Sequence, residues 1–303
     1  QNIFRMENFK SESIIDFFDT YKTDKDCLFY LAKIKWQDGF KCKKCNNTKC
    51  TIRKFNYARD CNLCHHIESS TANTLFHKVK FGIRKAFTIV FEMSCATKSV
   101  SSSQMARRLD ISRQTAWLFM HKVRLAMKSS DLYPITGHVL VGEFVYGGKE
   151  DLKQGRSNNS KKKKVVAAVE IDKKRGVKRA YFKRIDNYSS KELSKIFVSH
   201  ISNDAKITTD KWKGYQPLKK DYNITQIKSN VSDFFEMNTI IHQLKAGLRS
   251  VYSWMHEEHI EKYLNEYSYR LNRSKHKQTI FNNLINRMVK SKSTSYKEII
   301  ISS

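Results

Sequence analysis

The feature that most constrains the fold is a set of four cysteines in the first quarter of the chain. They form two Cys-x-x-Cys pairs, Cys42 with Cys45 and Cys61 with Cys64, and fifteen residues separate the pairs. A two-residue gap lets one tight turn present two sulfurs, so two such turns can surround one ion with four thiolates. The spacing predicts a structural Zn²⁺ site, because four protein ligands leave no position open for water.

Three neighbouring side chains leave the ligand set open. Cys50 lies between the two pairs, and His65 and His66 follow Cys64, so each of them can replace a thiolate. The alternative to a metal site is a group of four reduced, buried thiols. The remaining cysteines, Cys27 and Cys95, are isolated, which favours a reducing intracellular compartment over a disulfide framework.

The chain carries a large excess of positive charge. Its 303 residues include 57 Lys and Arg against 29 Asp and Glu, a formal net charge of +28, while 40% of the residues are hydrophobic. This apolar fraction suffices for a core and excludes a wholly disordered chain. The charge indicates a polyanionic partner, most simply nucleic acid, and a merely soluble basic protein is the alternative. No apolar run approaches the roughly 18 residues of a membrane helix, so we expect no membrane partner.

Hydrophobic periodicity divides the chain into an α+β multidomain arrangement. Apolar residues at helical spacing predict an N-terminal helical segment over 1–36, and the cysteine pairs define a zinc ribbon over 37–78. Helical periodicity returns over 79–130. The pattern then changes to mixed strands and helices over 137–290, followed by a tail over 291–303.

Two apolar runs in the region that begins at residue 137 predict buried strands. They are Val139–Val141 and Val165–Val169, and a basic, polar insert at 149–175 falls around the second run. The insert contains ten Lys and Arg against four Asp and Glu. Helical patterns follow near Ser189–Ser199 and dominate after Glu236, which predicts an α/β core with a mixed sheet.

Residues 98–117 have the layout of a helix, a short turn and a second helix. Ser102 or Ser103 can cap the first helix, and Ser112 can cap the second. The second helix is predicted to bury Ala116, Trp117, Met120 and Val123. Its exposed side then carries side chains suited to phosphate and base-edge contacts in a major groove: Arg113, Gln114, His121, Lys122 and Arg124. An ordinary helical hairpin in a core is the alternative to a DNA-binding helix-turn-helix.

Four further segments complete an ordered series of motifs. They are Val141–Glu150, Thr209–Tyr215, Gln243–Arg249 and Tyr263–Arg273. With the zinc ribbon and the helix-turn-helix, this order resembles the bacterial insertion-sequence transposases related to the eukaryotic Merlin transposons, over most of the chain. The resemblance implies an RNase H-like core that uses acidic residues and two Mg²⁺ ions. Such enzymes hydrolyse the ends of a DNA element and join the freed 3′-hydroxyls to target DNA.

The resemblance implies three metal-binding positions, and this sequence departs from the pattern at two of them. The first Asp position of the family falls on Gly142. Glu143 is adjacent, but in a strand its side chain points to the opposite face unless a bulge re-aims it. The second acid is matched by Asp210, and the third position, Asn or Glu in the family, falls on Gln243. The lysine that follows in the family is matched by Lys245, a candidate phosphate contact.

A second acidic residue competes for the third metal-binding position. Glu266 can be a ligand or an ion-pair partner of Arg270, and we favour the ion pair. The basic stretch from Arg270 and Arg273 to Lys290 is predicted to follow DNA phosphates, and a solvated helix face is the alternative.

By resemblance, the expected function is that of an insertion-sequence transposase. It would bind element ends and target sites in double-stranded DNA and catalyse Mg²⁺-dependent strand cleavage and strand transfer. We expect a homo-oligomer in the cytoplasm, associated with the nucleoid. The alternative is a catalytically inactive relic that retains DNA binding, since Gly142 replaces the first carboxylate. A zinc-ribbon transcription factor without nuclease ancestry is a third interpretation, which leaves Asp210 and the C-terminal half unexplained.

Overall fold

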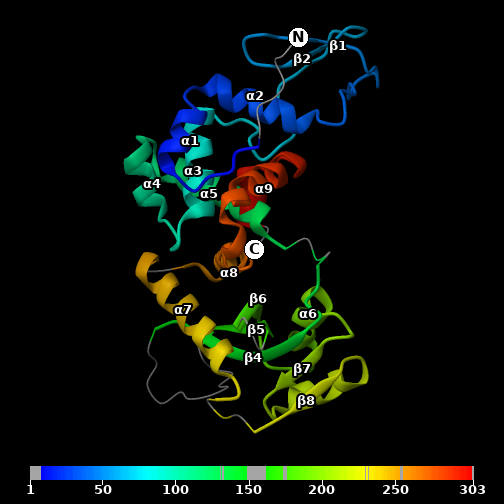
Figure 1. Ribbon diagram of the computed structural model, residues 1–303, viewed down its shortest axis with the longest axis vertical. Helices are drawn as coiled ribbons and strands as arrows, with labels where there is room; N and C mark the ends of the chain where they lie inside the picture. Colours follow the sequence, from blue (N-terminus) through cyan, green and yellow to red (C-terminus); the bar gives the residue numbers. More distant parts are fainter. Residues whose placement is uncertain are drawn as a thin grey trace. The chain divides into compact units, whose positions relative to one another are not determined.

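The computed structural model describes residues 8–129, 131, 133–148, 162–172, 176–228, 230, 232–252 and 255–301. The chain divides into two compact units (Figure 1). The first unit combines Gln1–Met127 with Arg273–Ser302, and the second is Lys128–Asn272.

The first unit is mainly helical. Its core is a cluster of aromatic rings around Phe281, whose centroid lies 5.5–6.0 Å from those of Phe17, Tyr21, Phe87 and Phe91. The helices that supply or surround these rings are α1 (Ile14–Thr20), α2 (Asp24–Lys35), α3 (Ile83–Cys95), α4 (Ser102–Leu109), α5 (Arg113–Met127), η3 (Ser274–His276), α9 (Lys277–Lys290) and α10 (Tyr296–Ile301).

The helix that carries Phe281 comes from the far end of the chain. α9 packs against α2, α3 and α5, so it belongs to the first unit. The sequence-based core over 137–290 is therefore longer than the compact unit, which ends at Asn272. The apolar stripe of α9 has helical periodicity, but periodicity does not reveal which neighbours cover it.

A small antiparallel sheet lies within the first unit. Its strands β1 (Cys50–Ile52), β2 (Arg59–Cys61) and β3 (Ile67–Glu68) pair in chain order. Cys50 pairs with Cys61 across β1 and β2. The sheet thus carries one of the two cysteine pairs at the end of its central strand.

The second unit contains a mixed five-stranded sheet, in the order β6-β5-β4-β7-β8. β4 pairs antiparallel with β5 and β5 antiparallel with β6, whereas β7 pairs parallel with β4 and β8 parallel with β7. The two predicted apolar strands are confirmed as parts of β4 and β5. The bounds are β4 (His138–Tyr146), β5 (Lys163–Asp172), β6 (Gly176–Ile185), β7 (Lys206–Thr209) and β8 (Ile224–Gln226).

Helices cover both faces of this sheet. Val139 and Val141 of β4 face a cluster with α6 (Ser190–His200) and η1 (Lys213–Lys220). Leu140 and Phe144 face the opposite cluster, formed with α7 (Phe235–Val251), η2 (Glu257–His259) and α8 (Ile260–Leu271). The alternation along β4 therefore assigns each residue of the strand to one of two buried faces.

Part of the predicted basic insert lies outside the described residues. This applies to residues 149–161 and 173–175, which include Lys149 and Glu150 of the Val141–Glu150 motif, whereas 163–172 forms β5. Among the helices of the described ranges, none is both long enough and apolar enough to cross a bilayer.

Candidate functional site

The four predicted cysteines of the first unit meet at one point. Their sulfur atoms all lie within 4.8 Å of one another, with Cys42 Sγ 3.6 Å from Cys64 Sγ and Cys45 Sγ 3.5 Å from Cys61 Sγ. Tetrahedral zinc–thiolate geometry requires sulfur–sulfur distances of roughly 3.8 Å. The donor set and its spacing therefore fit a Zn²⁺ ion.

Two turns of the same design bring these sulfurs together. The backbone N–H of Asn46 donates to the carbonyl of Cys42, and that of His65 donates to the carbonyl of Cys61, both at 2.9 Å. Asn46 and His65 adopt positive φ values of 59° and 54°, which turn the chain directly after each pair. The cluster does not include Cys50, His65 or His66, so none of the three alternative ligands replaces a thiolate in it.

Hydrogen bonds to the Cys61 sulfur favour its thiolate form, whereas the neighbouring thiols raise the pKa of Cys45. Backbone N–H groups, above all that of Cys64, together with the side-chain amide of Asn47, lower the pKa of Cys61 to about 6. Asn47 Nδ2 lies 3.4 Å from Cys61 Sγ, and the backbone N–H of Lys44 donates to Cys42 Sγ at 3.4 Å.

In the second unit, Gly142 lies in the middle of β4 on the face that α7 covers. It alternates with Leu140 and Phe144, which contact residues of α7. A Cβ atom placed on Gly142 would lie 2.7 Å from Cε and 3.3 Å from Sδ of Met237. The Met237 side chain of α7 thus occupies the space into which a side chain at position 142 would extend.

Glu143 belongs to the other face of the sheet. β4 and β5 pair without interruption from His138 to Tyr146, so no bulge re-aims Glu143. Its neighbours by alternation are Val141 and Val145, and Val141 packs in the cluster with α6. Glu143 therefore does not replace a carboxylate on the α7 face.

Asp210 directly follows the short strand β7, which is parallel to β4. Val141 pairs with Thr209, so the register continued by one residue puts Asp210 beside Gly142. Asp210 Oδ1 accepts a hydrogen bond from the backbone N–H of Trp212 at 3.0 Å, and its carbonyl accepts one from Gln226 Nε2 at 3.0 Å. These bonds hold Asp210 at the carboxyl end of β7.

Gln243 is exposed and lies six residues after Met237 in α7, about 9 Å further along the helix and on a different side of it. Lys245 contacts β4, since its ammonium lies 5.1 Å from the ring of Phe144. Burial, together with the charges of Arg249 and Lys162, lowers the pKa of Lys245.

The helices α4 and α5 follow the predicted layout of the helix-turn-helix. The hydroxyl of Ser112 accepts a hydrogen bond from the backbone N–H of Thr115, so Ser112 caps α5 as predicted. The N-cap of α4 is Ser101 rather than Ser102 or Ser103. The turn passes through Asp110 with a positive φ of 48°.

The exposed side of α5 is smaller than predicted. Arg113 and Gln114 are exposed, and Lys122 is half-buried, with its ammonium donating to the carbonyl of His77. The expectation of exposure is wrong for His121 and Arg124, which are 0% and 2% exposed. The buried face of α5 is wider than one apolar stripe and includes these two polar side chains. Arg124 therefore has no surface with which to contact a DNA groove in this structure.

The basic residues at the end of the second unit are also largely covered. Arg270 pairs with Glu266 at 3.5 Å, and their side chains are 10% and 1% exposed. The preferred interpretation of Glu266 as an ion-pair partner is confirmed. Arg273, at the start of the returning segment, is half-buried.

The two units thus combine a four-cysteine centre with an α/β core built on a mixed sheet, an arrangement consistent with a transposase. Comparison with known families supports this class. Residues 134–272 match the family model of the ISXO2-like transposase domain, so this part of the chain is similar to transposase domains of that family. No curated protein and no solved structure matches the chain.

Sequence reasoning missed Met237 as a neighbour of Gly142. Its position in an apolar helix is typical of any core methionine. Only the packing of α7 against β4 identifies Met237 as the residue that fills this space.

Proposed function

We propose that this chain is a DNA-binding transposase polypeptide whose nuclease centre does not cleave DNA. The observation that carries the proposal is the packing of Met237 against Gly142, where the resemblance implies a metal-binding carboxylate. The strand order and directions of the five-stranded sheet, with three antiparallel strands followed by two parallel ones, support an RNase H-like core.

The residues on the α7 face do not fit a two-metal magnesium site. Mg²⁺ prefers oxygen ligands in octahedral geometry, and two ions need several carboxylates close together. Here Asp210 is the one carboxylate of the expected set beside position 142, while Glu143 lies on the opposite face and Gln243 on another side of α7. We therefore assign no catalytic step to Mg²⁺ in this chain.

DNA binding is supported by the first unit. The exposed Arg113 and Gln114 lie in the first turn of α5, where the recognition helix of a helix-turn-helix contacts base edges. Zn²⁺ bound by Cys42, Cys45, Cys61 and Cys64 would hold the two turns of the ribbon together. The net charge of +28 favours double-stranded DNA as the partner, and we propose that the protein acts as a homo-oligomer at the nucleoid of the cytoplasm.

Two measurements test this proposal with the full chain. Fluorescence anisotropy with a labelled 30-base-pair duplex should show binding that weakens steeply with salt, because bound phosphates release counterions. Arg113→Ala should weaken binding, whereas Lys22→Ala, at an exposed position near the start of α2, serves as the charge-matched control. Absence of binding would refute the DNA partner.

The second measurement is nicking of DNA that carries the element's ends, in the presence of Mg²⁺ or Mn²⁺. We expect no nicking by the unmodified protein. Nicking that Asp210→Asn abolishes would contradict the inactive centre and favour a cleaving transposase, the second candidate, which the position of Asp210 beside Gly142 supports.

A further inference from the structure

The first unit contains a pocket of about 620 Å³ that neither the cysteine centre nor the helix-turn-helix explains. It is lined by residues of α2, the first cysteine turn, the segment 72–74 and the end of α9. Its charged lining residues are five lysines and one glutamate: Lys35, Lys41, Lys43, Lys290, Lys292 and Glu68.

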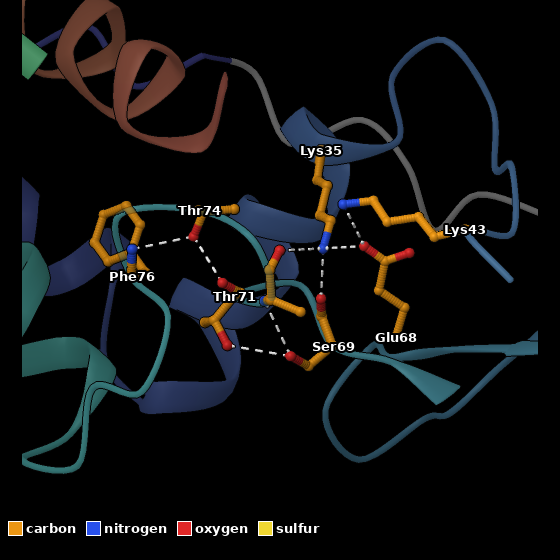
Figure 2. A network of polar contacts seen from close by, with 8 residues as sticks. Lys35, Lys43, Glu68, Ser69, Thr71, Thr74 and Phe76 are labelled. Carbon is orange, nitrogen blue, oxygen red and sulfur yellow. Dashed lines mark hydrogen bonds and ion pairs between the residues drawn. The ribbon is translucent and has the colours of Figure 1, made fainter. Parts of the chain in front are cut away.

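Lys35 and Glu68, two of the lining residues, form a buried ion pair (Figure 2). Lys35 Nζ lies 2.8 Å from Glu68 Oε1, and it donates to the carbonyls of Ser69 and Ala72 at 2.7 Å. The Lys35 and Glu68 side chains are 10% and 3% exposed. Because Lys35 is buried, pairs with Glu68 and donates to two carbonyls, it shapes the pocket and leaves ligand contacts to the exposed lysines.

The other four lysines keep their charge on the solvent side. Lys43 lies 3.4 Å from Glu68 Oε1 but its side chain is 53% exposed. Lys41, Lys290 and Lys292 are exposed, and no carboxylate in the described ranges lies within ion-pair distance of them. Since Lys35 neutralises Glu68, the pocket presents the charge of these four lysines to whatever enters it.

We propose that this pocket binds backbone phosphates of DNA, an assignment that rests on the proposed function and extends it. The four lysines come from two segments far apart in the sequence, 41–43 and 290–292, and converge on one concave surface. Lysine is a strongly hydrated point charge on a flexible stem, which suits phosphate contacts that carry no sequence information.

The lining disfavours an acidic protein as the occupant. The centres of protein–protein interfaces are depleted in lysine, whereas four of the thirteen residues that line this pocket are exposed lysines. The surface of DNA offers a regular array of charges, one per about 1.7 Å of helix axis, so several lysines can be neutralised at once.

The test compares two double variants of the full chain that each remove two charges. Lys290→Ala/Lys292→Ala alters the pocket, and Lys22→Ala/Lys25→Ala alters exposed lysines near the start of α2, at the opposite end of that helix from Lys35. The readout is the anisotropy of a labelled 30-base-pair duplex between 50 and 300 mM NaCl. Neither double variant touches a cysteine ligand, and equal zinc content and equal melting temperature are the check on folding.

We expect the pocket variant to lower the slope of log K against log salt by roughly 1.8, or about 0.9 for each phosphate that is no longer neutralised. The same relation predicts that affinity falls about eightfold per phosphate at 0.1 M salt. The control variant should change the slope by less than half as much.

Three results would overturn the inference or the function beneath it. If the unmodified protein binds DNA with a steep salt slope and both double variants behave alike, the pocket assignment is wrong while the proposed function stands. If the unmodified protein does not bind DNA, both fall. If binding of poly-glutamate drops in the pocket variant while DNA binding is unchanged, the occupant is an acidic polypeptide.

Discussion

Replacing Gly142 by Asp should restore a metal ligand, and shortening Met237 as well should relieve the contact that the new side chain makes. Gly142 has ordinary strand geometry, so the backbone accepts a side chain. A Cβ at this position lies 2.7 Å from Met237 Cε, however, and ordinary van der Waals contact begins near 3.4 Å. The methionine must therefore move, and because the contact is with the far end of a flexible side chain, a change of its rotamer at about 0.5–1.5 kcal/mol suffices.

This cost sets the expected difference between two variants. Because the Cβ contact exists with or without an ion, this strain should lower the free energy of unfolding of Gly142→Asp by about 0.5–1.5 kcal/mol, and Mn²⁺ should bind Gly142→Asp and Gly142→Asp/Met237→Ala within about 10-fold of each other. Two carboxylates with water should give a dissociation constant on the order of 10⁻⁴ M in the double variant. Electron paramagnetic resonance of free Mn²⁺ measures both constants, and nicking of end DNA provides a second readout.

Two control substitutions separate the two faces of the sheet. Asp210→Asn, added to the double variant, should remove the gained Mn²⁺ binding, because the β4–β7 register places Asp210 beside position 142. Glu143→Gln should leave it unchanged, because Glu143 faces the other side. Equal Mn²⁺ binding by the unmodified protein and the double variant, or a loss caused by Glu143→Gln, would refute the assignment of faces.

Three further outcomes follow from the described contacts. Cys61→Ser should release the metal and unfold the ribbon, whereas Cys50→Ser should retain it; elemental analysis for zinc distinguishes them, and a metal-free unmodified protein would remove the site. Glu68→Gln leaves the buried Lys35 ammonium without its carboxylate and should lower the free energy of unfolding by about 3–5 kcal/mol in urea titration. The exposed control Glu12→Gln should lower it by less than about 0.5 kcal/mol, and equal effects would contradict the assignment of Lys35 and Glu68 as a buried ion pair. Burial lowers the pKa of His200 to about 4, below the roughly 6.5 of an unfolded chain. The contribution of neutral His200 to the free energy of unfolding, about 3 kcal/mol, is therefore complete above about pH 6.5 and is lost as the pH falls to about 4. His200→Phe keeps the stacking on Tyr181 and should flatten the dependence of stability on pH between 6.5 and 4, and an unchanged slope would refute this.

The four-cysteine cluster could be predicted from the sequence because its geometry is local. Each Cys-x-x-Cys turn is closed by its own backbone hydrogen bonds, so the spacing of residues determines the spacing of sulfurs. The same holds for the strands β4 and β5, whose apolar runs are long enough to require burial on both faces. The cap of α5 at Ser112 is another local feature that the chain itself specifies.

The neighbours of these elements could not be predicted, because they come from distant parts of the chain. Gly142 shows that a carboxylate is missing, but only the packing of α7 shows that Met237 fills its place. Helical periodicity predicts the apolar stripe of α5 but not how wide a face its neighbours cover, so the burial of Arg124 was missed.

The sequence by itself determined that the two Cys-x-x-Cys pairs form one candidate metal site, that the apolar runs of β4 and β5 are buried strands, and that the chain resembles transposases. Tertiary structure alone decided that α9 returns to the first unit and that Lys290 and Lys292 line one pocket with Lys41 and Lys43. The physical reason is that local periodicity specifies which surface of an element must be buried, whereas the partner that buries it depends on packing between residues hundreds of positions apart.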